Sequence, residues 1–133
     1  ARMYGYLYQN TDKNFTVLHA LDGYDEISLT GATKTISNGA EGMLSPHDFG
    51  LSQIHANTIV GGEDIASSAK IFMDVLQGKG TEAQNNVVCA NAGVAISTVE
   101  GISPKEGYEK AKESLSSGQG LKALKKLQEL SAA

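Results

Sequence analysis

Three carboxylates lie within five residues in the stretch Leu21–Ser28, LDGYDEIS. Asp25 and Glu26 are adjacent, and they follow the apolar run FTVLHA, whose aromatic and β-branched residues predict a buried strand. In open α/β sheets, ligands bind beyond the carboxyl ends of the strands. Two neighbouring carboxylates in that place can share one divalent cation or bridge two, and Mg²⁺ is usually held by one or two carboxylates together with substrate phosphates.

Two alternatives stay open at this loop. Acidic residues in loops are mostly solvated and bind nothing, and spacing alone does not separate this case from a metal site. Asp22 can instead cap the turn through its side chain, because aspartate often bonds to backbone a few residues further on.

Other reactive residue types give weaker signals. The single Cys89 lies in VVCANAGVAI, where a small buried apolar residue is expected rather than a reactive thiol. His19, His47 and His55 lack partners at zinc-binding spacing. The turn GGED reads as a helix start, since its two acids stand where a phosphate would bind. The chain has no P-loop, no G-x-S-x-G and no dinucleotide-binding fingerprint.

Length and composition predict one domain. The 133 residues suffice for a core without disulfides, and no apolar run approaches the roughly 20 residues that cross a bilayer, so we expect no membrane span. The first residues resemble neither a signal nor a transit peptide, which favours a cytoplasmic protein. A net charge of −4 argues against nucleic-acid binding, because phosphate backbones require a concentrated positive surface.

The elements that position the acidic loop follow from local patterns. Strands are predicted at Phe15–Ala20, Ile27–Thr30, Thr33–Ser37 and Glu41–Leu44. Caps, first-turn prolines and apolar stripes predict six helical segments. The first three are residues 1–9 with one apolar face, a short turn that begins at Ser45, and a helix from Asp64 to Gly78. The last three are a buried central helix after Thr81, a helix after Ser103 that Gly118 interrupts, and a helix at Leu121–Leu130 with one buried face.

These elements indicate an α/β chain in which helices pack on a partial mixed sheet of short strands. One strong strand and a few short ones are little sheet for so many helices, and the first helix has no capping residue. We therefore expect the chain to be the C-terminal part of something longer.

Several linked motifs resemble the C-terminal part of anthranilate phosphoribosyltransferases, over essentially the whole chain and in one order. The most specific are the G-x-D-E core at Gly23–Glu26, P-x-D-F-G-L at Pro46–Leu51, and the pair Asn91-Ala92 in the apolar helix. Ala20 and Tyr24 depart from residues frequent in that family, Gly and Leu respectively, but neither change removes a carboxylate.

The resemblance implies that the chain is the C-terminal portion of a nucleoside phosphorylase/phosphoribosyltransferase catalytic domain. The family transfers phosphoribosyl from phosphoribosyl pyrophosphate to anthranilate in tryptophan biosynthesis, usually as a homodimer. Asp25 and Glu26 match its acidic residues that bind two Mg²⁺ ions. No residue matches a catalytic nucleophile, and the substrate-binding segments are not in this chain, so we expect the chain alone to be inactive.

Two alternatives belong to other functional classes. One is a nucleic-acid-binding paralogue of the same fold without transferase activity, which the acidic composition disfavours. The other is a pyrimidine nucleoside phosphorylase of the related fold, which would not need the Asp25-Glu26 pair.

Overall fold

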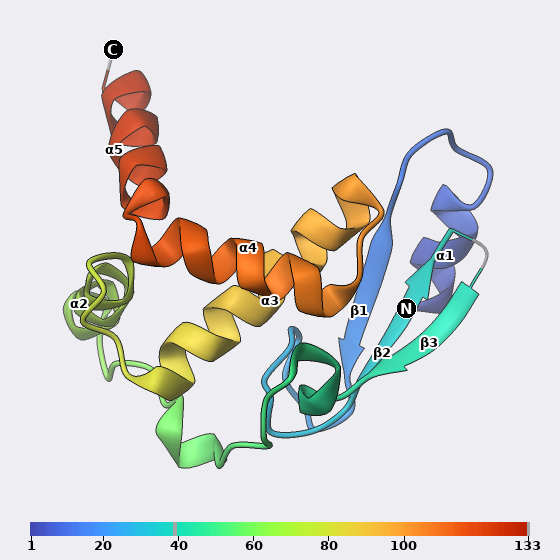
Figure 1. Cartoon of the computed structure of the whole chain (residues 1–133), viewed down its shortest axis with the longest axis horizontal. Helices are drawn as coiled ribbons and strands as arrows, with labels where there is room; N and C mark the ends of the chain where they lie inside the picture. Colours follow the sequence, from blue (N-terminus) through green and yellow to red (C-terminus); the bar gives the residue numbers. More distant parts are fainter. Residues whose placement is uncertain (39, 133) are drawn as a thin grey trace.

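The computed structural model describes residues 1–38 and 40–132 and shows a small sheet at one end of an assembly of helices (Figure 1). Helix α3 runs from the end that holds α2 toward the sheet, and α4 returns from there to α5. In chain order the elements are α1 (Arg2–Tyr8), β1 (Thr16–Ala20), β2 (Thr33–Ser37), β3 (Ala40–Leu44), the 3₁₀ turns Pro46–Phe49 and Ala56–Thr58, α2 (Ile65–Leu76), α3 (Glu82–Glu100), α4 (Pro104–Ser116) and α5 (Gln119–Ser131). The expected α/β architecture of short strands and helices is confirmed.

The three described strands pair in the order β1-β2-β3, and both pairings are antiparallel. A mixed sheet was expected, but a parallel pair needs a long crossover, and each connection here returns directly to the neighbouring strand. The alternating side chains separate two faces. Thr16 and Leu18 face α3, where the Thr16 and Thr98 hydroxyls lie 2.7 Å apart, whereas Ile36 faces α1 and packs on Gly5.

The helix starts follow the predicted caps. Thr81 and Ser103 each accept a hydrogen bond from a backbone N–H three residues on, at the beginnings of α3 and α4. Asp64, where only a helix start was predicted, caps α2 in the same way. At the first 3₁₀ turn the Asp48 carboxylate accepts from both the N–H and the hydroxyl of Ser45, each at 2.7 Å. The predicted helix starts are therefore confirmed.

The core lies between the loop that follows β1, the first 3₁₀ turn and the pair α3–α4. It contains Ile27, Leu29, Phe49, Cys89, Ala90, Val94, Tyr108 and Ala111, and the Phe49 ring meets Tyr108 edge to face with centroids 6.3 Å apart. The most extensive helix contact is α3 on α4. The sequence predicted a buried central helix, but only one side of α3 is buried: Val88, within the apolar run, is 44% exposed.

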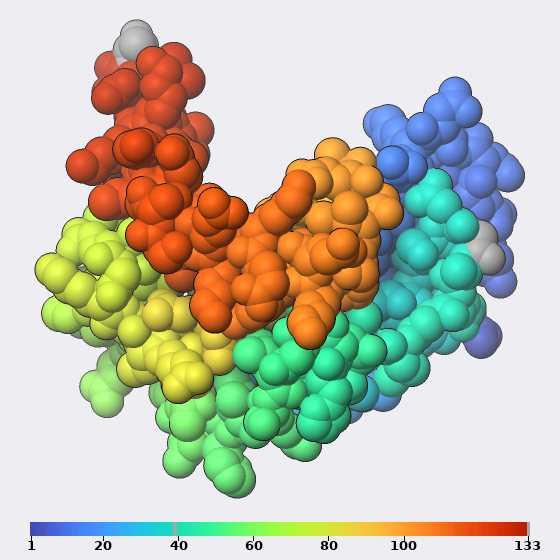
Figure 2. All heavy atoms as spheres, in the orientation of Figure 1, coloured from blue at the N-terminus to red at the C-terminus, as the bar shows by residue number. Residues whose placement is uncertain are grey.

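Two predicted apolar helix faces are not buried as expected. In α1 the apolar residues Met3, Tyr4 and Leu7 are exposed, and the sheet is met instead by Gly5. In α5 no residue is buried, and Leu127 and Leu130 lie open as the helix extends away from the body (Figure 2). Periodicity identified both helices correctly but cannot say whether a partner covers their apolar side.

The predicted strand Ile27–Thr30 is wrong. These residues form no strand, because Leu29 has φ of 60°, in the left-handed region that reverses an extended backbone. Leu29 is nevertheless 1% exposed. The segment behaves as a buried loop that inserts two apolar side chains, Ile27 and Leu29, into the core.

Within residues 1–38 and 40–132, no single helix has the length and hydropathy of a membrane span; α3 and α4 meet those criteria only when taken together across their bend.

Candidate metal-binding loop

The acidic residues lie in the loop that connects β1 to β2. The Leu21 N–H donates to the Ala32 carbonyl at 3.0 Å and closes the base of the loop, and Gly23 turns the chain with φ of 93°, a conformation open chiefly to glycine. Asp25 and Glu26 follow this turn and are exposed. The structure therefore places both carboxylates just beyond the carboxyl end of β1, as the sequence predicted.

Asp22 holds the two ends of this loop together. Its Oδ2 accepts hydrogen bonds from the Ser28 hydroxyl at 2.7 Å and the Thr30 hydroxyl at 2.5 Å. The Tyr24 N–H lies 3.5 Å from the other oxygen, a long contact. Asp22 thus has the turn-stabilising role that was one of its two expected roles, and its oxygens face into the loop.

Asn91 is the residue that sequence reasoning left without a role. From α3 its side-chain amide bonds to both backbone polar groups of Ile27, the residue directly after Glu26. The available signal was a single amide within an apolar helical run, VVCANAGVAI, since half-buried amides are normally hydrogen-bonded.

The pKa of the Asp22 carboxyl is also shifted. Its partial burial raises the pKa, but the hydrogen bonds from Thr30 and Ser28 outweigh this effect and leave the pKa below its ordinary value of 3.8. The ionised form is therefore the one that the folded loop stabilises.

Acid is expected to remove this stabilisation. Because the folded-state pKa of Asp22 is lowered, its contribution is complete above the unfolded value of 3.8 and is lost as the pH falls through the folded value. We expect Asp22→Asn to destabilise the chain at neutral pH, and the difference in unfolding free energy from the wild type to shrink as the pH falls below 3.8. Urea unfolding of both proteins at neutral pH and at pH values below 3.8 measures this difference. A difference that does not change with pH would contradict the role of the ionised Asp22 carboxylate.

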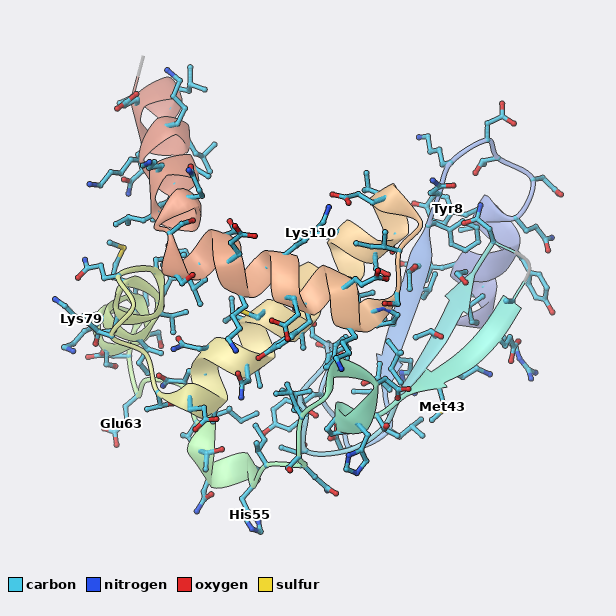
Figure 3. All side chains as sticks on the ribbon, viewed as in Figure 1. Tyr8, Met43, His55, Glu63, Lys79 and Lys110 are labelled. Atoms are coloured by element: carbon cyan, nitrogen blue, oxygen red, sulfur yellow. The ribbon has the colours of Figure 1, made fainter. Side chains whose placement is uncertain are left out.

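Three other candidate residues have different surroundings. His55 points outward from the loop after the first 3₁₀ turn (Figure 3). Cys89 is 2% exposed, and burial raises the pKa of its thiol, which favours the structural interpretation over a reactive one. The Asp64 carboxylate accepts from the Ser67 N–H at 2.7 Å and so caps α2, as expected of a helix start rather than a phosphate site.

The donor set of the loop suits a hard cation. Among the described residues no group of three or more His, Cys, Asp or Glu side chains could enclose a metal ion. Asp25 and Glu26 offer only carboxylate oxygens, on an open surface, and Mg²⁺ typically binds one or two such groups and fills its remaining positions with water and phosphate oxygens. The residues present fit Mg²⁺ as part of a coordination shell.

Comparison with known proteins identifies relatives of the whole chain. Residues 5–121 match the family described as "Glycosyl transferase family, a/b domain". Anthranilate phosphoribosyltransferase from Flavobacterium psychrophilum is 65% identical over 131 residues, which are 98% of this chain and 40% of that protein. The enzyme of the same name from Christiangramia forsetii is 61% identical with the same coverage. The chain thus spans about 40% of the length of these relatives.

Solved structures agree with this relationship. Anthranilate phosphoribosyltransferase from Thermus thermophilus superposes with a TM-score of 0.75 at 26% identity, covering 84% of this chain and 33% of that one. The Saccharomyces cerevisiae enzyme, in complex with PRPP and Mg, superposes with a TM-score of 0.71 at 28% identity, covering 83% and 32%. With a matching family model over most of its length, the chain belongs to the glycosyl transferase family, in its a/b domain.

Proposed function

We propose that this chain is part of an anthranilate phosphoribosyltransferase and contributes its cation site through Asp25 and Glu26. The supporting observation is the exposed pair at the end of β1, in a chain 65% identical to an enzyme of that name. A solved relative of that name is in complex with PRPP and Mg, the ligands that such a site would serve.

In the proposed reaction the anthranilate amine attacks the anomeric carbon of phosphoribosyl pyrophosphate. A carbon–nitrogen bond forms, the bond from that carbon to the pyrophosphate oxygen breaks, and the amine loses a proton. Bound Mg²⁺ would neutralise the charge that develops on the departing pyrophosphate. Asp25 and Glu26 would hold the cation, Asp22 would hold their loop closed, and no side chain of this chain acts as a nucleophile.

The wider assignments rest on the resemblance. We propose a role in tryptophan biosynthesis, a cytoplasmic location and a homodimer for the whole enzyme. The paralogue that binds nucleic acid and the pyrimidine nucleoside phosphorylase gain no support from the relatives described above, which bear the name of the transferase.

A chimera tests the activity directly. This chain would replace the matching 131 residues of the Flavobacterium psychrophilum protein, which supplies the remaining length. We expect the chimera to consume anthranilate, followed by its fluorescence, only when phosphoribosyl pyrophosphate and Mg²⁺ are both present, and the isolated chain to be inactive. A folded chimera without this activity, or a chain that binds nucleic acid tightly in a salt-sensitive manner, would overturn the proposal.

A further inference from the structure

The half-buried amide of Asn91 connects the core helix α3 to the acidic loop. Its Oδ1 accepts from the Ile27 N–H at 3.0 Å, and its Nδ2 donates to the Ile27 carbonyl at 2.8 Å. Nδ2 also donates to the Val87 carbonyl, 2.9 Å away and one turn earlier in α3, which fixes the orientation of the side chain. Flipping the amide would place donor against donor and acceptor against acceptor, so a single arrangement satisfies all three bonds.

These bonds lie at the boundary between a buried and an exposed part of the loop. Ile27 is 3% exposed and packs in the core, whereas Glu26, its neighbour, is exposed. Asp22 anchors the other side of the pair through Ser28 and Thr30. Only residues 23–26 lie between the two anchors, so little backbone freedom remains for the carboxylates.

The backbone that follows Ile27 is strained. Leu29 combines a φ of 60° with a fully buried side chain. Such conformations persist where the surrounding structure over-determines them, and they concentrate near functional sites.

We propose that Asn91 is a positioning residue for the cation site: it fixes the backbone directly after Glu26 and thereby sets the arrangement in which Asp25 and Glu26 bind a divalent cation. This inference rests on the proposed function of those two carboxylates. Asn91 itself touches no cation; it acts through the peptide groups of Ile27.

A purely structural role is the alternative, and α3 offers a matched control for it. Asn86 is also half-buried, and its Oδ1 accepts from the Tyr108 hydroxyl at 2.8 Å, so it ties α3 to α4 instead of to the loop. Replacing either asparagine with leucine, which has similar volume and no charge, removes hydrogen bonds and leaves buried polar partners unpaired. Only the change at residue 91 alters the loop.

The test is a titration of the folded chain with Mn²⁺ as a paramagnetic probe, followed through broadening of the Glu26 amide signal. We expect Asn91→Leu to weaken Mn²⁺ binding by about tenfold, in the range found when residues supporting metal ligands are removed. Exchange of the Ile27 amide hydrogen should accelerate by at least about tenfold, because the acceptor that the structure shows for it is lost. Asn86→Leu should lower thermal stability but leave both quantities unchanged.

Three outcomes separate the two proposals. Unchanged Mn²⁺ affinity in Asn91→Leu, or an equal loss in Asn86→Leu, overturns the positioning role. Unchanged affinity in Asp25→Asn plus Glu26→Gln instead overturns the cation site itself. Should Asn91→Leu fail to fold, Asn91→Ser replaces it in the same titration, since its smaller hydroxyl cannot reproduce the paired bonds to Ile27.

Discussion

Replacing Asp25 and Glu26 with Asn and Gln in the active chimera is expected to lower kcat/KM by about 100- to 1,000-fold. A bound cation contributes several kcal/mol to stabilising charge in a transition state, and about 1.4 kcal/mol corresponds to a factor of ten in rate. The amides keep the size of the carboxylates and lose their charge. Because both side chains are exposed, the double substitution should leave the melting temperature almost unchanged.

The control matches the charge change elsewhere on the surface. Asp12→Asn plus Glu63→Gln also removes two negative charges from loop positions outside the acidic loop. In kinetics at varied Mg²⁺ concentration, the variant at Asp25 and Glu26 should need more Mg²⁺ than the unsubstituted chimera, and the control variant should need the same amount. Equal losses in the two variants would mean that overall charge, and not a cation site, is responsible.

Helix starts and strands that depend on neighbouring residues alone were predicted well from the sequence. The caps Asp64, Thr81 and Ser103 act within a single turn, and each begins its helix at the expected residue. The strands Thr33–Ser37 and Glu41–Leu44 were likewise found within one residue. The exposed pair Asp25-Glu26 was predicted for the same reason, since it follows a strand that is evident from six consecutive residues.

Tertiary effects account for what was missed. The apolar run at Ile27–Thr30 resembles a strand, and only its packing against α3, with Leu29 in a left-handed conformation, makes it a loop. The bond between Asn91 and Ile27 joins residues 64 positions apart, so the local pattern could indicate a hydrogen-bonded amide but not its partner. The apolar faces of α1 and α5 are correct as patterns, but burial depends on a partner surface.

The contact of α3 with α4 was also invisible in the sequence, and it depends on two glycines at the crossing. A Cβ on Gly93 would lie 2.6 Å from the Tyr108 backbone nitrogen and 2.7 Å from its Cα. A Cβ on Gly107 would lie close to the Gly93 carbonyl oxygen, well inside van der Waals contact. Since these neighbours are backbone atoms, no side-chain rotation can relieve the clash, and the helices must separate.

Gly93→Ala is therefore expected to destabilise the chain by about 3 kcal/mol or more, at the upper end of overpacking costs, despite the better helix propensity of alanine. In thermal unfolding this corresponds to a fall of roughly 10 °C in Tm. Gly120→Ala in α5 is the matched control, because its Cβ would meet only the Leu76 side chain at an ordinary 3.4 Å, and it should be neutral or slightly stabilising. Equal melting temperatures for the wild type and Gly93→Ala would show that α3 and α4 do not approach as closely as the structure indicates.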